Sequence, residues 1–335
     1  AVVTSNALAT KAGEKILAEG GNAYDAATTI SAMLSVVEPF ASGLGGGAFW
    51  LIYDAKSKKY TMLDARETAP LQSHKNMYLD ENANVIKNMS TLGPLSAGIP
   101  GVPAVLSYVN DKYGSKKLST LLDPAYEAAI NGFPVNERYL KGAKYKKKWL
   151  KKYKETEAIF LHKGEVPKKG WILKQTDLAR TIKKLMKDGH RSFYTGGFAK
   201  RMVESVQNNG GIWSEGDLNR YKVLEREPVR SSYKGISIIA PGLPSSGGLV
   251  LSNALNILAG YELDKLSPTT QKHLIIESLR RAYYERALKM GDPDFMDNTL
   301  EFLLTPSYAA KQRKSLNINY ATDNQTLEFA DPPYQ

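Results

Sequence analysis

A helix that is apolar almost all the way round constrains this fold most. Residues 24–37 place apolar side chains on every side of the predicted helix: Ala26, Ala27, Ile30, Met33, Leu34 and Val37. Such a helix is packed between layers instead of lying on a surface. A glycine-rich bend at 43–47 follows, and then two β-rich runs joined by a short turn at 55–58. This pattern predicts a hairpin of antiparallel strands at 48–54 and 59–66.

The rest of the chain reads mainly as helices. In a helix after Ser5 or Asn6, which can cap it, we expect three residues to face inward: Leu8, Ala12 and Ile16. Further helices are predicted over 175–187 and 214–221, and the run 234–240 is predicted to be a buried strand. Antiparallel strands with segregated helices indicate a layered α+β fold.

The order of Ser267 and Pro268 is typical of a helix start. The helix that follows is predicted to run through Lys289 and to carry three residues inward: Ile275, Leu279 and Ala282. The chain has no visible repeat and no linker long enough to separate two domains, so we expect residues 1–335 to form a single domain.

The charge is strongly positive, with 45 Lys and Arg against 34 Asp and Glu and a net +11. This excess favours an anionic partner or surface. Eight of the fourteen residues 141–154 are Lys, which is most typical of a solvated helix face. Attraction to an anionic cell surface is the second interpretation of this segment. Nucleic-acid binding is disfavoured, because no compact DNA- or RNA-binding module surrounds the run.

The sequence gives little support for a metal site or for a membrane-spanning segment. There are no cysteines, and the four histidines are scattered singly, so no metal site or cofactor is predicted. No stretch of about 18 uninterrupted apolar residues exists to span a membrane. The chain opens on AVVTSNALATKAGEKIL without the segments of a signal peptide, so either the protein is cytoplasmic or a signal peptide was removed.

Three segments contain residues that are candidates for binding or catalysis. Arg66 ends a hydrophobic strand and is flanked by Asp64 and Glu67. Two interpretations stay open: Arg66 forms an exposed ion pair, or it is an arginine fork that binds a substrate carboxylate. PGLPSSGG lacks a nearby base and is better explained as a turn, with Ser246 capping the next helix. The acidic side chains of GDPDF give only weak support for a cation site, and the segment is sufficiently explained as the end of a helix.

Nine segments occur in one order that resembles the large subunit of γ-glutamyltransferase, also called γ-glutamyltranspeptidase or glutathione hydrolase. In chain order they are GGNAYDAA (20–27), EPFASGLGGGAF (38–49), LDARETAP (63–70), AGIPGVPA (97–104), HRSFYTG (190–196), DLNRY (217–221), PGLPSSGG (241–248), AYYERA (282–287) and GDPDF (291–295). The resemblance covers nearly the whole chain.

The resemblance implies an N-terminal-nucleophile hydrolase with an αββα sandwich, whose two central sheets are completed by a small subunit from the same self-cleaved precursor. The nucleophile would be the first Thr of that subunit, since this chain ends on ADPPYQ without a Thr-Thr-His-like run. Arg66 matches the family arginine that binds the α-carboxylate of glutathione or another γ-glutamyl substrate. Secretion or a periplasmic location is also implied.

The sequence departs from the family pattern at Ala65, where an aromatic residue is common, and at Ala48, where Gly is common. The lysine-rich segment is not part of that pattern either. Three alternatives stay open: a relative acting on poly-γ-glutamate, a cephalosporin-type acylase, and a non-catalytic binding protein of the same fold. The basic surface would suit a polyanionic poly-γ-glutamate.

Overall fold

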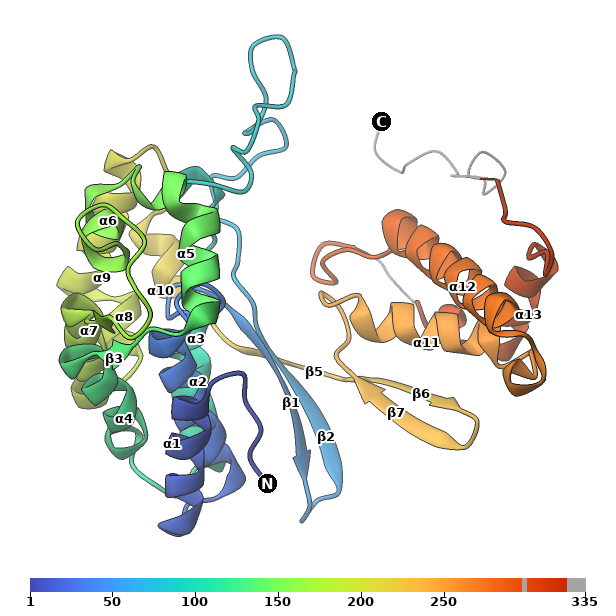
Figure 1. The fold of residues 1–335 in the computed structure, drawn as a ribbon, viewed down its shortest axis with the longest axis horizontal. Helices are drawn as coiled ribbons and strands as arrows, with labels where there is room; N and C mark the ends of the chain where they lie inside the picture. The colour runs from blue at the N-terminus through green and yellow to red at the C-terminus, as the bar shows by residue number, and fades with distance from the viewer. Residues whose placement is uncertain (297–299, 324–335) are drawn as a thin grey trace. The chain divides into compact units, whose positions relative to one another are not determined.

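The computed structural model describes residues 1–296 and 300–323 of an α+β chain (Figure 1). Packing divides the chain into two compact units. Unit 1 contains residues 1–48 and 65–224, and unit 2 contains 49–64 and the chain from 225 onward. The α+β class is confirmed, whereas the single domain and the completed four-layer sandwich remain predictions.

Unit 1 is mainly helical. Its helices are α1 (Ala7–Ala18), α2 (Ala23–Val37), α3 (Val102–Tyr113), α4 (Leu118–Asn131), α5 (Glu137–Leu150), α6 (Lys154–Phe160), α7 (Thr176–Asp188), α8 (Arg191–Tyr194), α9 (Gly196–Asn208) and α10 (Glu215–Arg220), with a 3-10 turn, η1 (Pro94–Ser96). Two short strands, β3 (Phe133–Pro134) and β4 (Ile172–Leu173), pair antiparallel. Helix α2 packs against α1, α3 and α4, which confirms the prediction of a helix enclosed by neighbours.

The helix starts follow the expected capping chemistry. The Asn6 side chain accepts from Leu8 N at 3.0 Å and caps α1, and the Ser214 side chain caps α10 by accepting from Asp217 N. The inward face of α1 was only partly predicted. Ala12 and Ile16 are buried, but Leu8 is 38% exposed, and its neighbour Ala9 takes the inward position of the first turn at 0% exposure.

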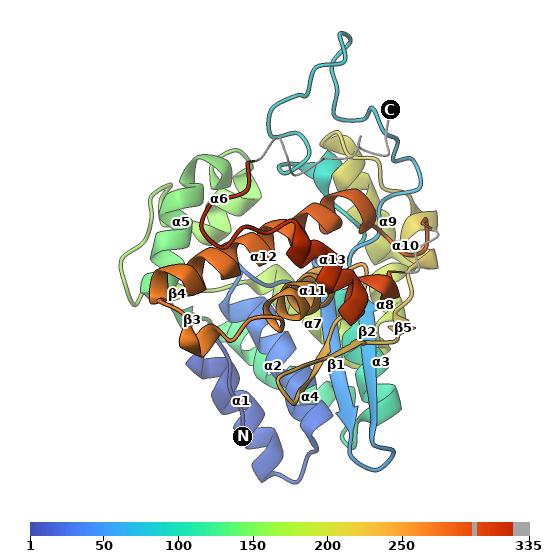
Figure 2. The same cartoon turned by 90° about the vertical axis from the view of Figure 1, so that its right-hand side faces the viewer.

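Unit 2 contains nearly all of a three-stranded sheet, a separate hairpin and three helices. The sheet has the order β1 (Ala48–Asp54), β2 (Lys59–Ala65), β5 (Leu224–Arg226), and β1 and β2 run side by side in both views (Figures 1 and 2). The hairpin pairs β6 (Val229–Tyr233) with β7 (Ile236–Ala240). The helices are α11 (Gly247–Leu258), α12 (Pro268–Lys289) and α13 (Pro306–Lys314), with 3-10 turns η2 (Leu263–Lys265) and η3 (Glu301–Leu304).

Two predictions about unit 2 were wrong in part. Of the run predicted as a buried strand, 234–240, residues 236–240 form strand β7. This strand belongs to a two-stranded hairpin, and Ile236 is 66% exposed. Helix α12 starts after Ser267 and buries Ala282 as expected, yet Ile275 and Leu279 are 41% and 38% exposed.

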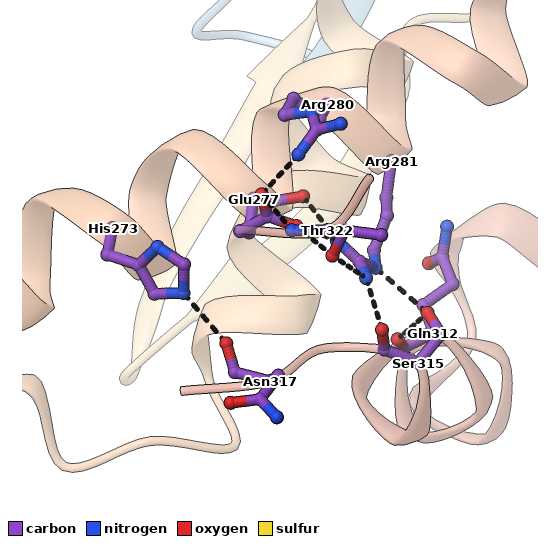
Figure 3. Close-up of polar contacts among 8 residues, drawn as sticks. All are labelled: His273, Glu277, Arg280, Arg281, Gln312, Ser315, Asn317 and Thr322. Carbon is purple, nitrogen blue, oxygen red and sulfur yellow. Dashed lines mark hydrogen bonds and ion pairs between the residues drawn. The ribbon is translucent and has the colours of Figure 1, made fainter. Parts of the chain in front are cut away.

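The buried face of α12 carries polar side chains one helical turn apart (Figure 3). Glu277 is 1% exposed and accepts from Arg280, from Arg281 Nη1 at 2.6 Å and from Thr322 Oγ1 at 2.5 Å. Arg281 donates in addition to the Ser315 hydroxyl and carbonyl at 3.0 and 2.6 Å. This cluster attaches the segment after α13 to α12. The inward face of this helix was predicted from its apolar residues alone, and these polar residues were missed.

Candidate functional site

Arg66 is the first residue beyond β2, and its side chain is exposed. Its backbone carbonyl accepts a hydrogen bond from the Tyr221 hydroxyl at 2.9 Å. Two residues later, Thr68 forms a β-bridge with Ile99, through bonds of 3.3 Å (Thr68 N to Ile99 O) and 2.8 Å (Ile99 N to Thr68 O). The segment LDARETAP is thus held by backbone bonds from AGIPGVPA and by a side chain of DLNRY.

Two positions near Arg66 must be glycine, because neighbouring atoms approach the backbone there too closely for a side chain. A Cβ at Gly101 would lie 2.0 Å from the Ala65 carbonyl oxygen and 2.1 Å from the Tyr221 hydroxyl. A Cβ at Gly47 would lie 2.6 Å from Glu67 N and 2.7 Å from the Ala65 oxygen. Real Cβ atoms do not approach so closely, so only glycine fits. The glycine-rich bend therefore packs tightly against a neighbouring strand end.

A pair of stacked tyrosines supports the same region. The rings of Tyr194 and Tyr221 are 5.5 Å apart and nearly parallel, at 7°. The Tyr194 hydroxyl donates to the Pro100 carbonyl at 2.8 Å and accepts from Ala104 N at 3.3 Å. Burial, and secondarily Tyr221, raise the pKa of Tyr194, so its hydroxyl stays protonated and remains a donor at physiological pH.

Asp217 links α10 to the chain that follows Arg66. Its carboxylate accepts from Leu71 N at 2.8 Å and also completes a capping box with Ser214. Five of the nine segments noted in the sequence therefore meet around the backbone of Arg66: those containing Gly47, Arg66, Gly101, Tyr194 and Tyr221. The structure holds the backbone beneath this guanidinium firmly. An exposed cation on a rigid support is suited to binding an anion.

The remaining motifs that were weighed for chemistry have structural partners in unit 2. Arg226 donates from Nε to Asp64 at 2.8 Å, and from Nη1 and Nη2 to Asp294 at 3.0 and 2.7 Å. Arg226 was not singled out in the sequence, where no local pattern marks it. These bonds, those to Asp294 above all, raise the pKa of Arg226 although burial opposes them. The GDPDF carboxylate therefore binds an arginine.

Ser246 does not act as predicted. It stands at the N-cap position of α11, but its side chain makes no capping bond, and its hydroxyl accepts from Arg286 Nε at 2.9 Å. Arg286 belongs to AYYERA, so PGLPSSGG and AYYERA are joined by this bond. The backbone of Ser246 is in the right-handed helical region, at φ −76° and ψ −13°, instead of the extended conformation of a capping residue, which accounts for the missing cap.

Metal-binding clusters and membrane-spanning helices are absent from the residues that the structure describes. Across 1–296 and 300–323, no three His, Asp or Glu side chains are grouped closely enough to hold a metal ion. None of the helices in that part of the chain combines the length and apolarity needed to cross a bilayer.

A family model described as Gamma-glutamyltranspeptidase matches residues 9–334. The chain belongs to this family. It is 40% identical over 337 residues to a glutathione hydrolase proenzyme of Pseudomonas sp. (strain A14), covering 100% of this chain and 58% of that relative. The chain thus spans little more than half of the length of the curated relatives it matches.

Solved γ-glutamyltranspeptidases have the same fold. The Helicobacter pylori enzyme superposes with a TM-score of 0.92 at 37% identity, over 96% of this chain and 92% of that chain. The Pseudomonas nitroreducens enzyme, solved in complex with L-DON, gives 0.90 at 32% identity, over 97% and 96%. The resemblance read from the nine segments is confirmed.

Proposed function

We propose that this chain is the large subunit of an enzyme that hydrolyses and transfers γ-glutamyl bonds, and that Arg66 binds the α-carboxylate of the glutamyl group. The observation that carries the proposal is the convergence of five of the nine segments on the backbone of one exposed arginine. A guanidinium offers two parallel N–H donors that match the two oxygens of a carboxylate. Family membership supplies the substrate class.

The reaction is an acyl transfer. A Thr hydroxyl on a partner chain from the same precursor attacks the γ-carbonyl carbon, with its own α-amine as base. The amine of the substrate leaves with a proton, and a γ-glutamyl ester remains on the Thr. Water or the amino group of an acceptor then attacks the ester and regenerates the hydroxyl. Arg66 takes no part in these bonds; it orients the substrate. We place the enzyme outside the cytoplasm, secreted or periplasmic.

The test removes the guanidinium of Arg66 and the α-carboxylate of the substrate in separate experiments. The substrates are γ-glutamyl-p-nitroanilide and 4-aminobutyryl-p-nitroanilide, which lacks only the α-carboxylate. Loss of a charge-assisted pair of bonds costs about 2 kcal/mol or more, so Arg66→Ala should lower kcat/KM for the glutamyl substrate about 30-fold or more, mainly through KM. The same variant should leave the weak turnover of the 4-aminobutyryl substrate unchanged. Arg220→Ala, an exposed arginine of α10, is the matched control.

Equal losses on both substrates would mean that Arg66 supports the fold and not the carboxylate. Unchanged kcat/KM with the glutamyl substrate would remove its role altogether. No chromophore release by the assembled wild-type protein would favour a binding protein. Faster release from glutaryl anilides than from glutamyl ones would favour an acylase of the cephalosporin type, and a preference for poly-γ-glutamate would identify the third alternative.

A further inference from the structure

The lysine-rich segment forms most of helix α5 and lies on one side of unit 1. Residues 137–169 carry twelve Lys or Arg against four Glu, a net charge of +8, whereas the whole chain carries +11. Only Tyr139 and Ala143 of α5 are buried. The predicted solvated helix face is confirmed, and it concentrates most of the excess charge of the protein.

Most of these lysines have no acidic partner. Lys147 pairs with Glu165 and Lys151 with Glu157. Within the described part of the chain, the other six form no ion pair: Lys141, Lys144, Lys146, Lys148, Lys152 and Lys154. All six are exposed. Their mutual repulsion is a cost that an anionic surface would remove.

Aromatic rings lie among these cations. Tyr145 is 82% exposed, although a tyrosine ring is normally at least half covered. Lys146 Nζ lies 5.3 Å from the centre of its ring, and Lys148 Nζ lies 6.0 Å from that of Trp149. Tyr145 and Trp149 are four residues apart and so occupy the same side of α5.

An open apolar hollow of about 310 Å³ is lined in part by Tyr145. Its lining includes Phe40, Tyr139, Tyr145, Leu150 and Phe160, with Lys146 at its edge. Cations, an exposed tyrosine ring, a half-buried tryptophan ring and an apolar recess therefore occur together on one surface. Nucleic acid or a soluble polyanion would use the lysines, and single-stranded bases would stack on Tyr145, but neither would account for the apolar hollow beside it.

We propose that this face, made of the six unpaired lysines with Tyr145 and Trp149, binds the surface of a bilayer that contains anionic phospholipids. The lysines contact lipid phosphates, and the two rings enter the interface between headgroups and acyl chains, where amphipathic aromatics are favoured. The protein is held on the surface and does not span the bilayer. This inference is independent of the γ-glutamyl activity.

The experiment measures binding of the assembled protein to vesicles in 0.1 M salt. Vesicles of phosphatidylcholine with one third phosphatidylglycerol should bind it, and pure phosphatidylcholine should not. Each Lys at such a surface contributes about fivefold, so Lys141→Gln, Lys144→Gln and Lys148→Gln together should weaken binding about 100-fold. The control has the same charge change at exposed lysines elsewhere: Lys11→Gln, Lys187→Gln and Lys200→Gln. Both sets should keep wild-type turnover.

Two readouts separate a bilayer from other polyanions. Trp149 fluorescence should shift to the blue with anionic vesicles, a shift that Trp149→Phe removes. Tyr145→Ser should reduce the binding that persists in 0.5 M salt, where charge attraction is screened. The proposal is overturned if both lysine sets bind alike. It is also overturned if duplex DNA or polyphosphate displaces the protein while neither ring affects binding, since that outcome identifies a general polyanion site.

Discussion

Replacing Glu277 by Gln tests whether the buried cluster on α12 stabilises unit 2. Glu277 is 1% exposed, and it accepts bonds from Arg280, Arg281 and Thr322. Arg281 is itself only 3% exposed. Glutamine keeps the size of the side chain but leaves the guanidinium of Arg281 buried without its counter-charge (Figure 3).

The expected loss follows from two arguments. Burial alone would raise the pKa of Glu277, but the bonds from Thr322, Arg281 and Arg280 lower it from 4.5 to about 2. That difference corresponds to about 3 kcal/mol in favour of the ionised, folded form. Removing one partner of a buried ion pair costs about 3–5 kcal/mol. We therefore expect Glu277→Gln to lower the free energy of unfolding by about 3–4 kcal/mol at neutral pH.

The pH dependence has a defined sign. Because the folded pKa is lower than the unfolded one, the stabilisation by Glu277 is fully present above pH 4.5 and is lost as the pH falls towards 2. The difference in stability between wild type and Glu277→Gln should shrink across that window, since glutamine does not titrate.

Urea titrations followed by circular dichroism measure these differences, and limited proteolysis reports release of the segment at 315–323. The control is Glu262→Gln, an exposed acid paired with Lys265, which should change stability by about 0.5 kcal/mol or less. Adding Arg281→Met to Glu277→Gln should restore about 1 kcal/mol, because no buried charge is then left alone. A loss below about 1 kcal/mol, or equal losses at pH 7 and pH 3, would refute the reasoning.

Two further substitutions test the packing of the other clusters. Gly101→Ala would place a Cβ 2.1 Å from the Tyr221 hydroxyl, so it should lower the free energy of unfolding by about 2 kcal/mol and raise KM several-fold. Gly45→Ala, which has open space around it, should change neither quantity. Steady-state kinetics and urea titration compare the two variants. Arg226→Met removes the fork beside Asp64, which is 7% exposed, and should cost about 3 kcal/mol in the same titration; a stability equal to wild type would show that the fork contributes nothing.

Local features of the fold were predictable because they depend on neighbours along the chain. The caps at Asn6 and Ser267 require only a short polar side chain before a run of helix formers. The hairpin of β1 and β2 requires only two β-rich runs and a short turn. Arg66 could be nominated because it ends a strand within a segment that resembles a known family pattern.

The errors concern which side of an element is buried. On α12, Ile275 and Leu279 were expected inside, but the helix turns its polar residues inward, where Glu277 meets Arg281. Hydrophobic periodicity cannot reveal this, because a buried ion pair depends on partners distant in sequence such as Thr322. Ser246 does not cap α11, because its backbone is already helical, and its hydroxyl accepts from Arg286, forty residues further along the chain.

The order of elements, the helix starts and the concentration of positive charge were decided by the amino-acid sequence alone, because each depends on residues close together in the chain. The convergence of five segments beneath Arg66, the arginine fork on Asp64 and Asp294, and the hollow beside Tyr145 were decided by the tertiary structure. Each of these depends on distances between segments separated by many residues, and those distances are set by packing.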